Sequence, residues 1–258
     1  MAVPPAGHAT KLVEAARGTG GEHALLAVLE VPGLLRDPVW RREDPDLGRG
    51  TGVVLVPGFG VGDASLALTR IWLRRRNFRP IGARIGLNVG CTTELVHRIE
   101  RRLEHHVRAT GGRAVLIGHS RGGGLARIAA VRRPDLVRGL VMLASPVLDP
   151  LGANPGVARA ARRLARFSAA GLPGLLDEDC LSGTCYDTSI EALRAPLPST
   201  VPALAVHSRN DRVTPWWLCL DPCAHCVEVT CSHTGMVLDP DVYRVLETHL
   251  TAWAGATP

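Results

Sequence analysis

Ser120 stands between two glycines, Gly118 and Gly122, in the pentapeptide GHSRG. The spacing G-x-S-x-G is typical of a strand that turns sharply into a helix, because residues without a side chain let the backbone segments pass close together. The run 113–117, which is apolar from Ala114 onward, and the alanine-rich segment that follows the turn predict such a strand and helix. A serine at this turn exposes its hydroxyl at a helix N-terminus, where the helix dipole favours negative charge. The pattern therefore predicts that Ser120 is a nucleophile.

A neutral serine hydroxyl is a poor nucleophile, so it needs a general base and an acid that orients this base. Where this turn occurs, the chain order is serine, acid, histidine, with both partners in loops that follow later strands. Asp211 follows the apolar run 203–206, and His233 follows the run 226–230. We therefore predict His233 as the general base and Asp211 as the acid.

Other acids and histidines fit these roles less well. Asp221 lies in the segment that leads into the last predicted strand. Asp239 and Asp241 follow His233 in the chain, which is the wrong order for the acid. His207, at the end of the fifth predicted strand, is the one serious rival for a polar role near the serine. His119 is too close to the serine in the chain to turn toward it. Three further histidines lie on a predicted helix, and we expect them at its surface: His97, His105 and His106.

Acyl transfer also needs donors for the negative charge that develops on the carbonyl oxygen, each worth roughly 3–4 kcal/mol. The main-chain N–H of Arg121, directly after the serine, is the first expected donor. The second is expected from the loop VPGFGVGD, whose glycines, Gly58 among them, let the backbone approach a substrate. We predict the main-chain N–H of Phe59 as that donor.

Six apolar runs alternate with helical patterns from residue 52 onward. This alternation predicts a single α/β domain with a mainly parallel, doubly wound sheet and helices on both faces. The predicted strands are 53–56, 80–84, 113–117, 140–144, 203–206 and 226–230. The predicted helices are 64–77 with Asp63 as its N-cap, 92–109, the segment from the serine to 132, and 241–253.

Two segments interrupt this alternation. Residues 1–50 contain a helix-like stretch, 22–35, but no hairpin, so their packing stays open. Residues 146–200 form an insertion between the fourth and fifth strands. A helix in it, starting near residue 156, carries arginines on one side and apolar residues opposite. The arginines are Arg159, Arg162, Arg163 and Arg166. Their face is either a solvated surface or a contact with anionic lipid or an acidic substrate.

From residue 52 to the C-terminus, about four-fifths of the chain, the sequence resembles the α/β-hydrolase superfamily in its lipase and esterase branch. PGFG resembles the oxyanion loop, GHSRGG the nucleophile turn, SRNDRVTP the acid turn and SHTGM the histidine loop. Pro57 stands where the family's HG or HGGG turn has histidine, as in some bacterial lipase-like members. The resemblance implies a cap over the active site, which residues 146–200 could supply.

The resemblance also implies a serine hydrolase that cleaves a small, apolar acyl ester through an acyl-enzyme, in the manner of an esterase or lipase. This chemistry needs no metal or organic cofactor. The same residues would serve a thioesterase or an acyltransferase, and a protein of this fold can also bind a ligand without catalysis. The sequence leaves these alternatives open.

The chain of 258 residues is 46% hydrophobic and 21% charged, which is ordinary for a folded domain with a sizeable core. Its net charge of +6 comes from scattered arginines without a basic stripe, so a nucleic-acid partner is not expected. No run approaches the ~20 apolar residues of a membrane span. The first 20 residues lack the pattern of a secretory signal. This favours the cytoplasm, with a secreted mature form as the alternative.

Seven cysteines are many for a cytosolic enzyme. The last four, at 219, 223, 226 and 231, invite interpretation as a zinc site. Cys226 and Cys231 flank a predicted strand, which places them about 16 Å apart at ~3.3 Å per residue, too far for one tetrahedral ion. A metal site is therefore not expected. A local disulfide, such as Cys180–Cys185, and small buried core residues are the alternatives.

Overall fold

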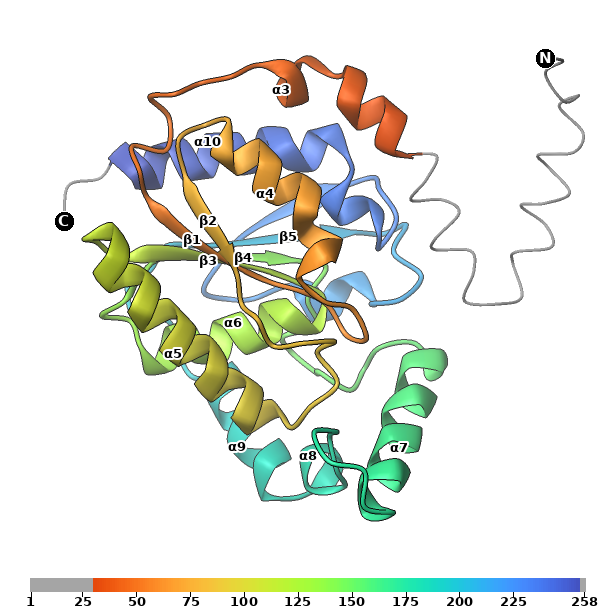
Figure 1. Cartoon of the computed structure of the whole chain (residues 1–258). Helices are drawn as coiled ribbons and strands as arrows, with labels where there is room; N and C mark the ends of the chain where they lie inside the picture. The colour runs from red at the N-terminus through yellow and green to blue at the C-terminus, as the bar shows by residue number, and fades with distance from the viewer. Residues whose placement is uncertain (1–29, 256–258) are drawn as a thin grey trace, which may run out of the picture.

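The computed structural model of the chain describes residues 30–255, and its centre is a six-stranded sheet (Figure 1). The strand order across the sheet is β2-β1-β3-β4-β5-β6, and every neighbouring pair is parallel. The strands are β1 (Gly52–Val56), β2 (Arg79–Gly82), β3 (Ala114–His119), β4 (Val137–Leu143), β5 (Ala203–Ser208) and β6 (His225–Val229). The predicted parallel α/β fold is confirmed. Because all strands run the same way, the loops at their carboxyl ends meet at one edge of the sheet.

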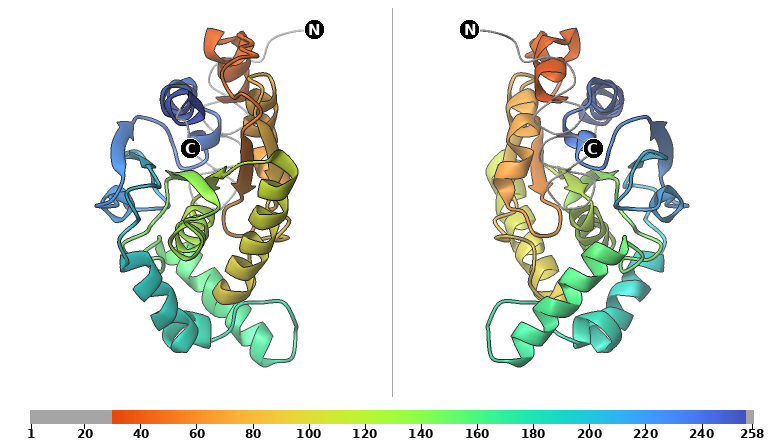
Figure 2. Two further views of the ribbon diagram at one scale, coloured as in Figure 1. Left: turned by 90° about the vertical axis from the view of Figure 1, so that its left-hand side faces the viewer. Right: turned by 90° about the vertical axis from the view of Figure 1, so that its right-hand side faces the viewer.

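Helices cover both faces of the sheet, as Figures 1 and 2 show. One face packs against α3 (Pro38–Arg41), α4 (Ala67–Arg74) and α10 (Pro240–Gly255). The opposite face packs against α5 (Thr92–Thr110) and α6 (Arg121–Arg132). Between β4 and β5 the chain forms α7 (Pro155–Ala169), α8 (Asp179–Ser182) and α9 (Thr184–Arg194). Short 3-10 helices lie between these elements: η1 (Asp63–Leu66), η2 (Trp216–Cys219) and η3 (Gly235–Val237).

Strand β1 shows why the sheet has a core on each side. Every residue of β1 is buried, with Val53 and Leu55 in one hydrophobic cluster and Val54 and Val56 in the other. Side chains alternate between the two faces of a strand, so an all-apolar run is stable only where helices cover both faces. Burial of each such side chain contributes roughly 1.5–3 kcal/mol.

The described part of the N-terminal segment packs against the layer of α4 and α10. Trp40 meets Tyr243 of α10 edge-on, with ring centroids 5.8 Å apart. Trp72 of α4 donates its indole N–H to the main-chain oxygen of Val39 at 2.9 Å. Residues 30–36 are helical, which agrees with the last part of the helix-like stretch predicted there. The first part of that stretch lies outside the described residues.

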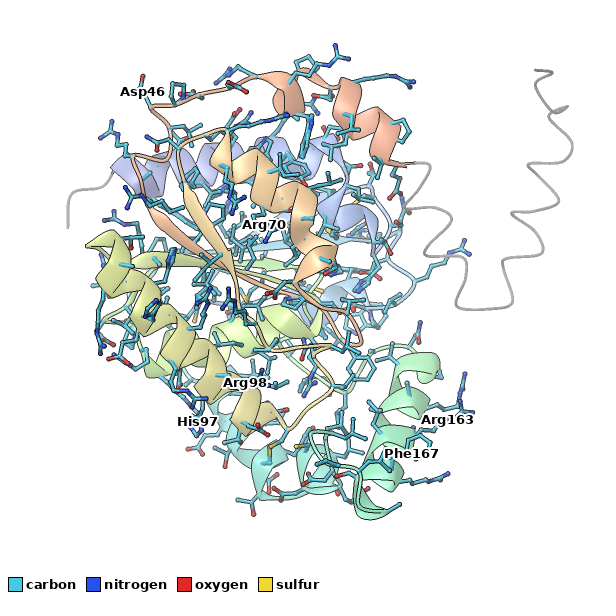
Figure 3. The ribbon with its side chains drawn as sticks, in the orientation of Figure 1. Asp46, Arg70, His97, Arg98, Arg163 and Phe167 are labelled. Carbon is cyan, nitrogen blue, oxygen red and sulfur yellow. The ribbon has the colours of Figure 1, made fainter. Side chains whose placement is uncertain are left out.

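The insertion between β4 and β5 is helical. Its α9 packs against α5 and α6 beside the sheet. Its α7 buries Ala161 and Ala165 against residues of α8 and α9. The four arginines of α7 are exposed, and Figure 3 shows Arg163 projecting away from the body of the protein. Phe167 on the same helix is 52% exposed. The amphipathic pattern predicted for this helix is therefore confirmed.

Three predicted features of the helices are wrong. The helix predicted over 64–77 is divided into η1 and α4 and ends at Arg74. Asp63 does not cap it, because its carboxylate accepts a hydrogen bond from the main-chain N–H of Arg84 at 3.2 Å. His106, expected at the surface, is buried with Nε2 2.7 Å from the main-chain oxygen of Arg79. Within residues 30–255, no helix is long and apolar enough to cross a membrane.

Candidate active site

Ser120 sits at a strained turn between β3 and α6. Its φ of 54° and ψ of −129° lie in a region that residues with a side chain rarely adopt. Two main-chain hydrogen bonds hold this conformation: Ser120 N–H donates to the oxygen of Leu143 at 2.8 Å, and Gly123 N–H donates to the oxygen of Ser120 at 2.9 Å. The chain thus makes the sharp strand-to-helix turn that the G-x-S-x-G spacing predicts.

Gly118 and Gly122 are required by close packing at this turn. A Cβ on Gly118 would meet the backbone of Gly122 and Gly123 at less than 3.0 Å. A Cβ on Gly122 would come equally close to the main-chain oxygens of Val56 and Pro57. The two glycines therefore let the end of β1, the end of β3 and the start of α6 come together.

Asp211 and His233 form a buried hydrogen-bonded pair. His233 Nδ1 lies 2.7 Å from Asp211 Oδ2, and the two side chains are only 10% and 2% exposed. The other carboxylate oxygen of Asp211 accepts from the main-chain N–H groups of Val213 at 2.7 Å and Thr214 at 2.8 Å. A carboxylate held in this way accepts the Nδ1–H of the imidazole, which leaves the lone pair on Nε2. His233 can therefore accept a proton at Nε2.

His119 contacts the loop of His233. Its buried ring places Nε2 3.0 Å from the main-chain oxygen of His233, and the two ring centroids are 4.9 Å apart. Burial, followed by the charge of nearby His233, lowers the pKa of His119 to about 3. The ring is therefore neutral at neutral pH. The sequence predicts that His119, next to the serine, is not the base, but it does not predict this contact with the His233 loop.

Ser120 and His233 line one cavity of about 870 Å³. Among the described residues no hydrogen bond joins the Ser120 hydroxyl to the His233 ring. Catalytic hydrogen bonds are often long before substrate binds and shorten in the complex. Val157 and Ala161 of α7 and Leu193 of α9 contribute apolar walls. The cavity has the size and lining of a site for a small apolar molecule.

The loop after β1 lies against the Ser120 turn. A Cβ on Gly58 would stand 3.3 Å from Ser120 Cβ, so this glycine allows the close approach. Phe59 and Arg121 both line the cavity, and the Arg121 guanidinium lies 5.9 Å from the centroid of the Phe59 ring. The main-chain N–H groups of these two residues remain the predicted donors to an oxyanion.

The guanidinium of Arg121 ties this loop to the segment before α5. Nη1 donates to the main-chain oxygen of Asn88 at 2.8 Å and to its Oδ1 at 3.1 Å. Nη2 donates to the main-chain oxygen of Gly90 at 2.8 Å and to Thr92 Oγ1 at 3.1 Å. Asn88 in turn donates to the main-chain oxygen of Pro57 at 2.7 Å. Burial lowers the pKa of Arg121 to about 10, so the side chain stays charged at neutral pH. No motif in the sequence indicates a task for this side chain.

A family model described as the alpha/beta hydrolase family matches residues 53–257, which is most of the chain. The chain belongs to this alpha/beta hydrolase family. No curated protein sequence matches it.

Solved structures share the hydrolase fold at low sequence identity. The mature lipase BlEst2 of Bacillus licheniformis superimposes with a TM-score of 0.61 at 12% identity, over 83% of this chain and 96% of that one. For a carboxylesterase structure from Nitrososphaera gargenis the TM-score is 0.55 at 16% identity, over 82% and 93% of the two chains. For the monoacylglycerol lipase of Paleococcus ferrophilus it is 0.53 at 17% identity, over 82% and 96%. At these identities the likeness establishes the fold.

The rival acid and histidine have other partners in this alpha/beta hydrolase. Asp221 is buried in an ion pair with Arg127 of α6. His207 is buried and stacks on Trp216 with ring centroids 5.9 Å apart, and burial lowers its pKa although Glu228 opposes the shift. Neither is among the described residues that line the cavity. Both side chains therefore have structural roles away from the serine.

The cysteines gather differently from the zinc and the disulfide interpretations, while the expectation of small buried core residues is confirmed for Cys180, Cys185, Cys219 and Cys231. In the described part of the chain, the candidate metal-binding group is Cys91 with Cys180 and Cys185, and the last four cysteines do not form one. The thiols of Cys180 and Cys185 are free, with Sγ atoms 3.4 Å apart, so the disulfide considered for them is not formed here. Cys91 was missed because it lies 94 residues from Cys185, and no local pattern links the two.

Proposed function

We propose that the protein is a serine hydrolase that cleaves carboxylic esters through an acyl-enzyme on Ser120. One observation carries the proposal: the buried Asp211–His233 pair, joined at 2.7 Å, lies at a cavity that the strained Ser120 also lines. Nucleophile, base and orienting acid on one sheet edge are the parts that acyl transfer by serine requires. Membership of the hydrolase family supports the same class of reaction.

In the proposed reaction Ser120 attacks the ester carbonyl while His233 accepts the hydroxyl proton at Nε2. Asp211 holds the Nδ1–H of the imidazole and stabilises the imidazolium that forms. His233 then gives the proton to the leaving alcohol, and the acyl group stays on the serine oxygen. Water attacks this acyl-enzyme as His233 takes its proton, and the acid leaves as the serine is restored.

The main-chain N–H groups of Arg121 and Phe59 stabilise the oxyanion in this proposal. The N–H of Arg121 belongs to the first turn of α6, where the helix dipole adds positive charge. The chain of hydrogen bonds from Arg121 through Asn88 to Pro57 O supports a rigid loop before Phe59. Rigid donors are effective because they need no reorganisation as charge develops.

The proposed substrate is an ester with an apolar acyl group, covered by residues 146–200 as a cap. The cap and α6 contribute apolar residues to the cavity: Val157, Ala161, Leu181, Leu193, Leu125 and Ile128. The exposed arginines of α7, next to exposed Phe167, support a peripheral contact with anionic lipid at the cap. Two structural neighbours are a lipase and a monoacylglycerol lipase, which agrees with an ester substrate.

Ester turnover by the full chain and by Ser120→Ala tests the proposal. We expect saturable hydrolysis of p-nitrophenyl esters of graded acyl length, reduced roughly 10⁴-fold or more in the variant. Turnover that survives Ser120→Ala would contradict the proposal. Acyl-CoA measured in parallel distinguishes a thioesterase, and product analysis with added alcohol distinguishes an acyltransferase. Ligand binding without any turnover would favour a binding protein on this fold.

A further inference from the structure

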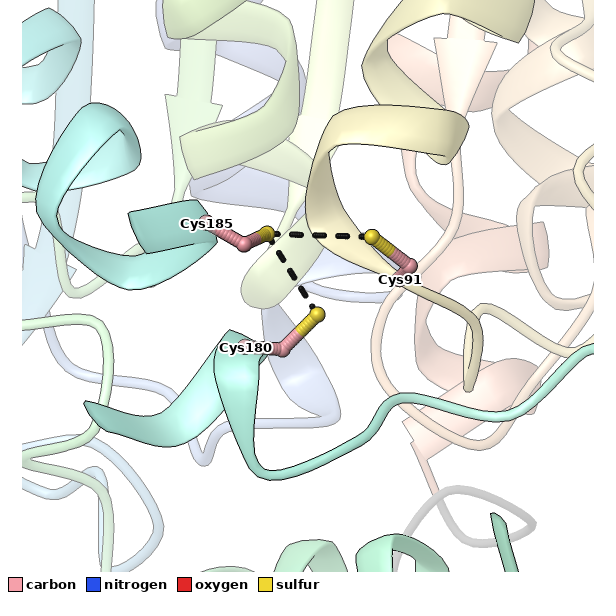
Figure 4. A group of neighbouring side chains, drawn as sticks. All are labelled: Cys91, Cys180 and Cys185. Atoms are coloured by element: carbon pink, nitrogen blue, oxygen red, sulfur yellow. Dashed lines mark hydrogen bonds between the residues drawn. The ribbon is translucent and has the colours of Figure 1, made fainter. Parts of the chain in front are cut away.

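Three thiols from two distant parts of the chain meet beside the cavity. Cys91 immediately precedes α5, Cys180 lies in α8 and Cys185 lies in α9 (Figure 4). Cys185 Sγ is 3.4 Å from Cys180 Sγ and 3.7 Å from Cys91 Sγ, and all three sulfur atoms lie within 4.8 Å of one another. Cys180 also lines the cavity.

These separations match the geometry of thiolate ligands around one ion. Sulfur ligands at ~2.3 Å from a tetrahedral zinc ion stand about 3.8 Å from each other. The three sulfur atoms can reach this arrangement by small side-chain rotations. A disulfide uses only two thiols and would leave the third without a partner.

The charge around the cluster favours an anionic complex. The guanidinium of Arg121 interacts electrostatically with all three thiols. Its four hydrogen bonds go to uncharged acceptors on Asn88, Gly90 and Thr92, and within residues 30–255 no carboxylate forms an ion pair with it. Zn²⁺ with three thiolates carries a net charge of −1, which this buried cation balances.

The first turn of α5 supplies further donors to the sulfur atoms. The main-chain N–H of Thr92 faces Cys180 and that of Thr93 faces Cys185, while Thr93 Oγ1 lies 3.3 Å from Cys185 Sγ. Hydrogen bonds of this kind orient and stabilise metal ligands. Helix α5 is 19 residues long, so its dipole also favours negative charge at this end.

We infer that Cys91, Cys180 and Cys185 bind one thiophilic divalent ion, Zn²⁺, through three thiolates, with the fourth position open to water. The ion would join α8 and α9 of the insertion to the start of α5, and so hold the insertion over the cavity. Its role is structural, and no step of the proposed ester hydrolysis passes through it.

Metal binding to the reduced, chelator-treated full chain tests this inference. Cys91→Ser removes one ligand, and because serine is a favoured N-cap residue the start of α5 should be retained. Cys223→Ser is the matched control, since Cys223 is exposed and lies outside the cluster. The readouts are native mass spectrometry with Zn²⁺, the thiolate-to-cobalt absorption band with Co²⁺, and the change in Tm on adding Zn²⁺.

We expect one Zn²⁺ per chain in the wild type and in Cys223→Ser, with a thiolate–cobalt band and a higher Tm. Cys91→Ser should bind roughly 10–100-fold more weakly or not at all, and its Tm should not respond to Zn²⁺. The inference would be overturned if the wild type binds no Zn²⁺ or if Cys91→Ser binds it as tightly as the wild type. It would also be overturned if two of the three cysteines form a disulfide that persists after the protein is reduced and transferred to buffer with Zn²⁺, and so prevents the ion from binding.

Discussion

His119 Nε2 lies 3.0 Å from the main-chain oxygen of His233, although 114 residues separate the two histidines in the chain. His119 ends β3 immediately before Ser120, and His233 follows β6, three strands away in the sheet. The contact therefore links the strand that carries the proposed nucleophile to the loop that carries the proposed base. A carbonyl oxygen only accepts, so Nε2 of His119 must hold a hydrogen.

The stability of the protein should fall in acid partly because His119 resists protonation. Its pKa is about 3 in the folded state, lowered first by burial, against an ordinary 6.5. The unfolded chain therefore binds an additional proton below pH 6.5, and the stability present above that pH is lost as the pH falls toward 3. For this one group the loss between about pH 7 and about pH 4.5 should be on the order of 2–3 kcal/mol.

His119→Gln isolates this contribution, because glutamine can donate to the same carbonyl but does not titrate. Urea denaturation at both pH values should give a smaller loss of stability in the variant than in the wild type. Carboxylates and the other histidines contribute equally to both proteins and cancel in the difference. The same pH dependence in both proteins would show that the ring titrates normally.

Asp211→Asn should reduce kcat by roughly 10⁴-fold, because the amide can donate to Nδ1 and so favour the wrong tautomer of His233. The carboxylate is nearly fully buried and makes the 2.7 Å contact with the ring, and within residues 30–255 no other carboxylate pairs with this histidine. Steady-state ester hydrolysis gives the measurement. Asp187→Asn, an exposed carboxylate on α9, is the control and should leave kcat unchanged. Near-normal turnover of Asp211→Asn would mean that another acid orients the base.

Gly122→Ala should lower the free energy of unfolding by about 1–3 kcal/mol, because the new Cβ collides with the main-chain oxygens of Val56 and Pro57. Gly124→Ala is a matched control two residues further along α6, where a Cβ meets nothing within 4 Å. It should raise stability by roughly 0.5–1 kcal/mol, as alanine is favoured over glycine inside a helix. Chemical denaturation measures both, and equal stability of the two variants would show that the turn is not tightly packed.

The sequence predicts the order of the strands along the chain well, because runs such as 53–56 and 114–117 are apolar on both faces and are followed by glycine or proline. It also places Asp211 and His233 in the loops where the structure brings them into contact. Helix limits were harder to predict, since the Asp63 carboxylate bonds to the distant Arg84 rather than to its own helix.

The remaining features depend on contacts between parts of the chain that no spacing rule connects. The hydrogen bonds of Arg121 to Asn88, and the meeting of Cys91 with the cysteines of α8 and α9, arise only when the insertion folds beside α5. His106 is buried because the edge strand β2 offers it a carbonyl at Arg79. Such long-range partners leave no periodic signal in the sequence.

Covalent labelling with a fluorophosphonate tests the central claim most directly, because the reagent reacts with a serine hydroxyl that a neighbouring base activates. The native chain should gain one adduct, located at Ser120 by peptide mass spectrometry, and Ser120→Ala should gain none. A folded native chain that gains no adduct, or an adduct that persists in Ser120→Ala, would contradict the account.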